Sequence, residues 1–328
     1  MKKIITLSFL FIFSMSAAQW ENAKPFAETI DQEDLRKLLY VYASDYFQGR
    51  DTGSEGQKRA VNFLKEFYQA RNISAASGTE DYFQKVELTI RGKEIKSENV
   101  VAIVEGSTIP DEYIVISSHL DHVGMKDGEI YNGADDDGSG TVALLEIAEA
   151  FQKAADAGLQ PKRSLVFLHV TGEEKGLLGS KYYTDNPLYP IANTVANLNI
   201  DMVGRIDPKR DSENRNYIYL IGSDRLSTEL HEISEAVNKA TTKIELDYTY
   251  NAENDPNRFY FRSDHYNFAK NNIPVIFYFN GTHDDYHRPS DTVEKIEYDL
   301  LTERAKLVFY TAWEVANRES KLVVDKAK

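Results

Sequence analysis

The fold is decided by the stretch Ser118-His119-Leu120-Asp121-His122-Val123-Gly124, which is followed by Tyr131-Asn132-Gly133-Ala134-Asp135-Asp136-Asp137-Gly138-Ser139-Gly140. An apolar run of strand length, residues 112–117, precedes this stretch, and residues 141–151 behind it carry apolar side chains at helical spacing. The polar cluster therefore lies where a buried strand ends and a helix begins, which is where ligands bind in an open α/β sheet. Two imidazoles and four carboxylates crowded there would repel one another unless a cation joined them. The stretch favours a metal site, with an Asp-rich surface turn as the alternative.

The amino terminus has the pattern of a secretory signal. Met1-Lys2-Lys3 forms a basic head, residues 4–15 form an apolar run, and Ser16-Ala17-Ala18 supplies small residues of the kind that precede a signal peptidase cut. The apolar run is too short to span a bilayer comfortably. We therefore expect residues 1–18 to be a signal peptide that is cleaved near Ala18. The mature protein is then exported, periplasmic or secreted, and has no membrane anchor.

Residues 19–328 are expected to form a single domain, because no Pro-, Ser- or Gly-rich linker divides them. The chain has no cysteine, so a metal ion here would be held by His, Asp and Glu alone. The formal net charge is −14, which makes nucleic acid an improbable partner because its phosphates need cationic contacts.

The periodicity of the apolar residues predicts an α/β fold. Strand patterns cover residues 82–90, 99–104, 113–117, 164–170, 195–200, 217–221, 244–248 and 274–279, with a hairpin through Arg91-Gly92. Helical spacing covers residues 34–47, 54–71, 141–157, 177–184 and 300–316, with Ser54 as an N-cap. From residue 113 onward the two kinds of segment alternate. This alternation predicts a mixed, mostly parallel, twisted sheet flanked by helices on both faces.

Polar clusters recur where three later strands end. Glu173 and Glu174 follow the strand at 164–170, and adjacent carboxylates point in different directions, so one can bind a metal while its neighbour reaches a water molecule. Asp201 follows the strand at 195–200, where a turn-capping role is the alternative. Beyond the strand at 274–279, His283 and His287 are both possible ligands, and His265 in the separate segment Arg262-Ser263-Asp264-His265 is a third candidate. The residue pattern does not choose between these late histidines.

The motifs in this order resemble the zinc-dependent exopeptidases of the M28 family, of the aminopeptidase Y and aminopeptidase S type. They are His-x-Asp at 119–121, Gly-Ala-Asp-Asp-Asp-Gly-Ser-Gly at 133–140, Gly-Glu-Glu-x-Gly-Leu-x-Gly-Ser at 172–180, Asp-Met at 201–202 and Tyr-His-x-x-x-Asp-Thr at 286–292. Gly49-Arg50 and Thr52-Gly53-Ser54 also resemble the amino-terminal segment of that family. The likeness runs from about residue 45 to about residue 310 and implies the phosphorylase/hydrolase-like fold of zinc exopeptidases.

The resemblance implies two zinc ions per chain. Its ligands are Asp136 as the bridging carboxylate, His119 and Asp201 on one ion, and Glu174 and His287 on the other. It further implies hydrolysis by a hydroxide that bridges the ions, with Glu173 as the general base. Asp121 resembles the carboxylate that orients His119. Tyr286 has the place of a phenol that polarises the scissile carbonyl.

We therefore expect a secreted metallo-aminopeptidase that removes amino-terminal residues from peptides. A single-zinc glutaminyl cyclase or a carboxypeptidase on the same fold is the alternative, and a non-catalytic peptide-binding protein is a more remote one. Arg262 offers a cation for a substrate carboxylate. His122 and His283 are extra imidazoles beside the motifs, for which we expect a role in lining the substrate site. The sequence does not determine the preferred side chain or the oligomeric state.

Overall fold

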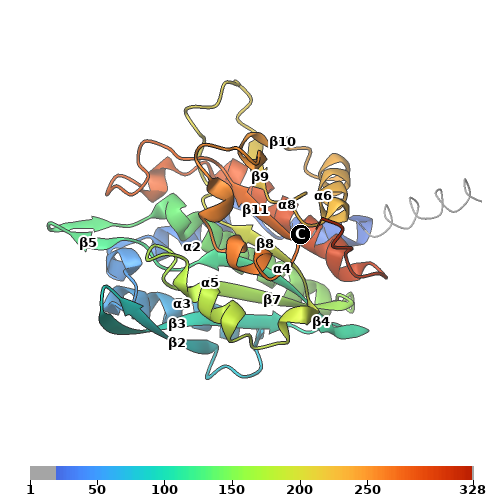
Figure 1. Cartoon of the computed structure of the whole chain (residues 1–328), viewed down its shortest axis with the longest axis horizontal. Helices are drawn as coiled ribbons and strands as arrows, with labels where there is room; N and C mark the ends of the chain where they lie inside the picture. Colours follow the sequence, from blue (N-terminus) through green and yellow to red (C-terminus); the bar gives the residue numbers. More distant parts are fainter. Residues whose placement is uncertain (1–19, 327–328) are drawn as a thin grey trace, which may run out of the picture.

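The computed structural model describes residues 20–326, so the predicted signal peptide lies outside the described residues. A central sheet contains nine strands in the order β1-β3-β7-β4-β8-β11-β9-β10, with β2 paired to β3 (Figure 1). The strands are β1 (Ser74–Ala75), β2 (Phe83–Ile90), β3 (Lys93–Val104), β4 (Ile109–His119), β7 (Arg163–Val170), β8 (Thr194–Ile200), β9 (Tyr217–Ile221), β10 (Glu245–Asp247) and β11 (Val275–Phe279). The central strands β7, β4, β8 and β11 are mutually parallel, whereas β3 and β9 run antiparallel on either side of them.

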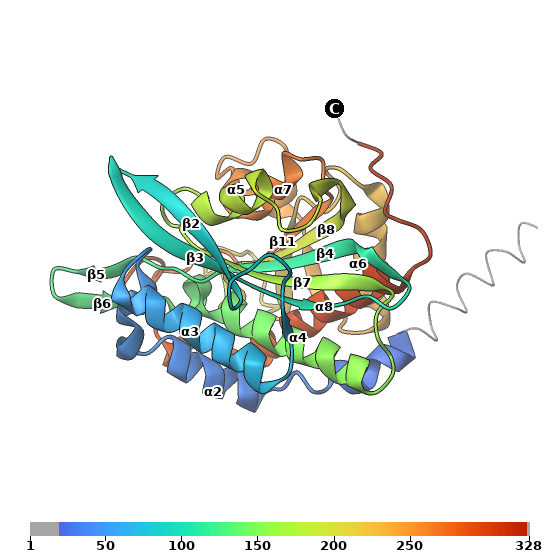
Figure 2. The same cartoon turned by 90° about the horizontal axis from the view of Figure 1, so that it is seen from below.

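Helices cover both faces of the sheet, as the alternating pattern predicts. The long helices are α2 (Gln32–Tyr42), α3 (Glu55–Ala70), α4 (Gly140–Asp156), α6 (Thr228–Ala240) and α8 (Tyr298–Asn317). Figure 2 shows α2, α3, α4 and α8 on one side of the sheet, and the shorter α5 (Leu178–Asp185) and α7 (His265–Ala269) on the other. The mixed α/β sheet predicted from the sequence is confirmed.

The central strands are apolar on both faces because each face is covered. Ile114 and Ile116 of β4 pack into the core under α4 and α8, and Val115 between them packs into the core under α5 and α7. Such continuous apolar strands are typical of a parallel sheet buried on both sides.

Local sequence signals fix several boundaries. The Ser54 hydroxyl accepts a hydrogen bond from the Gln57 N–H at 3.2 Å and caps α3, as predicted. Arg91 and Gly92 both have positive φ angles, which suit the tight turn of the β2–β3 hairpin. A small hairpin of β5 (Gly124–Lys126) and β6 (Glu129–Tyr131), which the periodicity did not predict, separates the two parts of the metal-site stretch. Among the described residues, no helix is long and apolar enough to cross a bilayer.

Candidate metal centre

The four parallel strands bring the predicted ligands to one edge of the sheet. His119 is the last residue of β4 and pairs with Val170, the last residue of β7, three positions before Glu173. Ile200 of β8 pairs with Tyr278 of β11, one position before Asp201. Because parallel strands end at the same edge, segments that are more than 150 residues apart in the chain meet there.

The Asp136 carboxylate lies between two sets of side chains. Its Oδ1 is 3.2 Å from Nε2 of His119, which is itself 3.6 Å from Oδ1 of Asp201. Its Oδ2 is 3.0 Å from Nε2 of His287, which is 3.2 Å from Oε1 of Glu174. Each oxygen of the Asp136 carboxylate therefore faces one imidazole, and that imidazole also lies next to one further carboxylate. This is the arrangement expected of a ligand that is shared by two cations.

The three consecutive aspartates have different roles. The Asp137 oxygens also lie near His119 and Asp201, but they accept backbone N–H bonds from His119, Gly140 and Met202 at 3.0–3.1 Å. Those bonds occupy the Asp137 carboxylate and leave Asp136 as the carboxylate free to bind a metal. The peptide bond between Asp136 and Asp137 is cis.

Asp135 and Asp291 hold the loop that carries Asp136. The Asp291 carboxylate accepts the backbone N–H groups of Asp135 and Asp136 at 3.0–3.2 Å. Asp135 accepts from Ser139 at 2.9 Å and from His283 Nε2 at 3.2 Å. His283, for which a lining role was predicted, thus contacts Asp135 in this supporting network, and no further role follows from its contacts.

The position of His119 is fixed through its second ring nitrogen. Nδ1 donates to the backbone carbonyl of Asp121 at 3.0 Å, which leaves Nε2 for Asp136 and Asp201. The Asp121 carboxylate is 4.0 Å from His119 Nδ1 and instead accepts from the Thr52 hydroxyl and the Glu173 N–H. Asp121 therefore orients His119 through its carbonyl, and its carboxylate positions the backbone of Glu173.

The electrostatics of the site reflect this crowding. Burial alone would raise the pKa of Asp136, but the imidazoles of His122, His119 and His287 hold it well below its usual range. Burial raises the pKa of Glu173 well above its usual range, and Asp201 adds to the rise. In contrast, the imidazoles lower the pKa of the neighbouring Glu174 to about 2 despite its burial. The pKa values of Glu173 and Glu174 are therefore shifted in opposite directions. Such divergence within one cleft is typical of sites with separate proton-transfer and ligand roles.

A small cavity of about 30 Å³ opens beside His119, Asp136 and Asp201. Glu173, Tyr286 and Arg262 line it together with the apolar residues Met202, Phe259, Phe277 and Phe279. The Arg262 guanidinium lies 4.9 Å from the centre of the Phe259 ring. The predicted base, phenol and cation therefore share one cavity with three of the predicted ligands, His119, Asp136 and Asp201.

Two supporting residues were not assigned a role from the sequence. The Ser263 hydroxyl donates to Asp201 Oδ2 at 2.6 Å and fixes that carboxylate. The buried Arg50 guanidinium donates to the carbonyls of Leu120, Asn132 and Gly133 at 2.6–3.1 Å, and so ties the two parts of the metal-site stretch together. The resemblance of Gly49-Arg50 to the family's amino-terminal segment was the signal that could have found Arg50.

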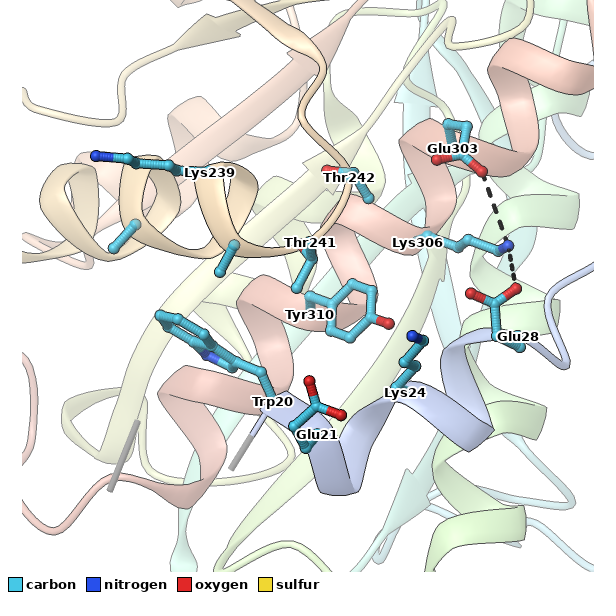
Figure 3. Close-up of a pocket in the computed structure, with 12 residues that line it drawn as sticks. Trp20, Glu21, Lys24, Glu28, Lys239, Thr241, Thr242, Glu303, Lys306 and Tyr310 are labelled. Atoms are coloured by element: carbon cyan, nitrogen blue, oxygen red, sulfur yellow. Dashed lines mark hydrogen bonds and ion pairs between the residues drawn. The ribbon is translucent and has the colours of Figure 1, made fainter. Parts of the chain in front are cut away.

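A second cavity, of about 660 Å³, is lined by none of the predicted ligands (Figure 3). Trp20 and Lys24 from the amino-terminal helical segment face Tyr310 of α8 and Thr241 at the end of α6 across it. No histidine lines it, and its Lys306 is paired with Glu28 and Glu303. This cavity is therefore larger than the one beside His119, but it lacks the imidazoles of the candidate metal centre.

Fold and site together define a hydrolase-type metal centre at the carboxyl edge of a mixed α/β sheet. The model of "Peptidase family M28" matches residues 99–312, and the chain belongs to this family. It is a metallo-exopeptidase.

Individual relatives agree with this assignment. A probable leucine aminopeptidase from Arthroderma otae is 29% identical over 302 residues, which cover 87% of this chain and 77% of the relative. The structure of a zinc aminopeptidase from Bacillus subtilis superposes with a TM-score of 0.66 at 15% identity, covering 89% of this chain and 98% of the other. Glutaminyl cyclase from Porphyromonas gingivalis superposes with a TM-score of 0.68 at 20% identity, covering 87% and 98%. At these identities the two structures establish the fold.

Proposed function

We propose that this chain is an exported di-zinc aminopeptidase that removes amino-terminal residues from peptides. The observation that carries the proposal is the Asp136 carboxylate, whose two oxygens face two separate sets of nitrogen and oxygen ligands. One set adds His119 and Asp201, and the other adds His287 and Glu174. Histidine nitrogens and carboxylate oxygens are ligands that zinc accepts, and three protein ligands per ion leave room for water and substrate.

Two zinc ions held by these residues would acidify a shared water molecule and polarise the peptide carbonyl. The chain's own residues supply the proton transfers. Glu173 lines the same cavity as His119 and Asp136, and its raised pKa suits a group that accepts a proton and later gives it to the leaving amine. Its backbone is held by Asp121, so the carboxyl group is directed into the cavity without being a ligand itself.

Tyr286 and the apolar wall complete the proposed substrate site. Burial and the nearby Asp136 and Glu174 raise the pKa of the Tyr286 phenol, so it stays protonated and can donate to the oxygen that gains charge in the transition state. Met202, Phe259 and Phe279 give the cavity an apolar wall beside Tyr286.

The proposal is tested with amino-acyl reporter substrates. A leucine p-nitroanilide with a free amine is expected to be hydrolysed, and the same compound with an acetylated amine is not. A chelator abolishes the activity, zinc restores it, and elemental analysis gives two zinc ions per chain. Hydrolysis of the acetylated compound at an equal rate, or activity that survives complete removal of metal, contradicts the proposal.

Two related activities are tested in the same assay. The similarity of the fold to a glutaminyl cyclase favours a comparison with a glutamine-terminated peptide, whose conversion to pyroglutamate would mark a cyclase. Arg262 in the cavity favours a comparison with an amino-blocked peptide, whose carboxyl-terminal residue a carboxypeptidase would release. The two complete ligand sets favour the aminopeptidase over a single-zinc cyclase.

Export is a separate part of the proposal. The basic head and apolar run of residues 1–18 support it. Expression of the full chain, followed by amino-terminal sequencing of the protein outside the cytoplasm, is expected to find a start near Gln19. Full-length protein confined to the cytoplasm would contradict export without touching the proposed chemistry.

A further inference from the structure

We propose that His122 binds the second metal ion through Nδ1, in addition to the five ligands that the family resemblance implies. The inference rests on the proposed two-metal function. It assigns four protein ligands to the second ion, His122, Asp136, Glu174 and His287, and leaves three on the first.

The position of the His122 ring supports this role. Nδ1 lies 2.9 Å from Oε1 of Glu174 and 3.8 Å from Oδ2 of Asp136, the same two oxygens that face His287. The His122 and His287 rings stand edge to face, with their centres 5.7 Å apart. Two imidazoles thus approach one pair of carboxylate oxygens from different directions, which suits a cation surrounded by all four groups.

The hydrogen bonding at this place is incomplete in a way that a cation would correct. His122 is fully buried, yet neither of its ring nitrogens has a hydrogen-bond partner. Oδ2 of Asp136 and Oε1 of Glu174 also lack hydrogen-bond partners. Buried polar atoms without partners are costly. One cation bound to Nδ1 and these two oxygens would satisfy three of the four atoms at once.

A buried structural histidine in the same fold is treated differently. His169 of β7 is also fully buried, but its two ring nitrogens contact the hydroxyls of Tyr68 at 2.7 Å and Ser118 at 3.0 Å. Burial lowers the pKa of His169 to about 3, so it stays neutral within an ordinary hydrogen-bonded core. His122 has carboxylates in place of hydroxyls around it, which is the environment of a ligand.

The backbone makes room for the His122 ring. A side chain at Gly133 would place its Cβ 2.5 Å from Cδ2 of His122 and 2.1 Å from the carbonyl oxygen of Asp136. The absence of that Cβ lets the ring lie against the loop that presents Asp136. The same glycine therefore admits both groups to the second metal position.

The assignment predicts that the two ions bind with unequal strength. The second ion gains an imidazole, whereas the first keeps His119, Asp201 and the shared Asp136 and faces the cavity. We expect zinc titration of the metal-free enzyme to show two separate steps. In the variant His122→Leu, which keeps the side-chain volume, the tighter step should weaken by at least about 100-fold, because losing a ligand costs no less than losing a group that supports one. The amide oxygen of His122→Asn can lie near the position of Nδ1. The zinc affinity of this variant at the tighter step should therefore fall between those of the wild type and His122→Leu.

A ligand count on the wild-type enzyme tests the assignment without a variant. X-ray absorption of the di-zinc enzyme is expected to give three imidazoles for two zinc ions, and His122→Leu should give two. The control is His265→Leu, since His265 is equally buried but stacks on Phe277 outside both metal-ligand groups. This control should retain both binding steps.

Each outcome separates the two proposals. A wild-type enzyme with two zinc ions but only two imidazoles, or an unchanged titration of His122→Leu, overturns the role of His122 and leaves the two-metal function standing. A wild-type enzyme that binds fewer than two zinc ions overturns both.

Discussion

The two halves of the metal centre are built in different ways. His119 belongs to β4 itself, is 1% exposed and is fixed by a backbone carbonyl, whereas His287 comes from a loop after β11, is 36% exposed and has a positive φ angle. On the first half, Asp201 is also held by Ser263. On the second, Oε1 of Glu174 lies beside the His122 and His287 imidazoles and has no hydrogen-bond partner. The strands thus preorganise the first half, whereas the side chains of the second half are carried by loops.

The largest effect is expected when the residue shared by both halves is removed. Asp136→Ala should lose both metal ions and all activity, because it removes the one carboxylate whose two oxygens face the two halves. Elemental analysis and the leucine reporter measure both losses. An Asp136→Ala enzyme that keeps two zinc ions would show that Asp136 does not join the halves.

The next largest effects are expected for the neighbouring carboxylates Glu173 and Glu174, which have different predicted roles. Glu173→Gln should lower kcat by about 10²- to 10⁴-fold, the usual contribution of a general base, with zinc content unchanged. Glu174→Gln is the matched control and should lose the second ion, because its Oε1 lies beside His122 and His287. Substantial turnover by Glu173→Gln would remove Glu173 from the base role.

Tyr286→Phe tests a donor that lines the cavity together with Glu173 and the shared Asp136. Loss of one donor to the developing oxyanion should lower kcat by about 10²- to 10³-fold, with little change in KM or zinc content. Tyr248→Phe serves as a control because its hydroxyl bonds Glu235 outside the cavity. Equal kinetics for the wild type and Tyr286→Phe would exclude the phenol from the chemistry.

Ser263→Ala loosens the first half alone. Without the hydroxyl that holds Asp201, affinity for the first ion should fall by about 10- to 100-fold, and the second binding step should stay. Competition with a chelating dye measures both steps. Ser180→Ala, which removes a similar buried bond from Ser to Asp264, is the matched control. A loss that falls on the second ion would contradict the division into halves.

The last effect concerns the stability of the scaffold beneath both halves rather than activity or metal binding. Glu146 in α4 is buried, its Oε1 has no hydrogen-bond partner, and burial raises its pKa from 4.5 to about 8. Between these pH values the folded state binds the proton and the unfolded state does not. Stability therefore falls as the pH rises through this window, by at most about 1.4 kcal/mol per pH unit.

Glu146→Gln removes this titration. The variant should melt above the wild type at pH 8.5 and close to it at pH 5, as measured by calorimetry of the metal-free proteins. A difference in melting temperature that is the same at both pH values would contradict the raised pKa of Glu146.

Much of the fold could be predicted from local patterns. The strand at 217–221 and the hairpin through Arg91-Gly92 are found where their alternation and turn residues place them. The β5–β6 hairpin was missed because strands of three residues are too short to show a period. The start of β3 at Lys93 was missed as well, since its first residues are polar and lie outside the core.

The sequence named residues that the structure brings together, but it could not predict their contacts. The motif order selected Asp136 among three adjacent aspartates, and the structure adds the reason, because Asp137 is occupied by backbone N–H groups and Asp135 by Ser139 and His283. Ser263 could not be found, since a serine in a polar segment has no pattern that marks a partner on another strand.

The sequence by itself determined that apolar strands alternate with helices and that His, Asp and Glu follow the strand ends, because these are local properties of spacing and chemistry. Only the tertiary structure decided which of those side chains share an oxygen or a cavity. The parallel register of β7, β4, β8 and β11 brings the strand ends together, and the buried loops then orient His119, His122 and Asp136 toward common points. Such distances depend on pairings between strands that are far apart in the chain, which no local pattern records.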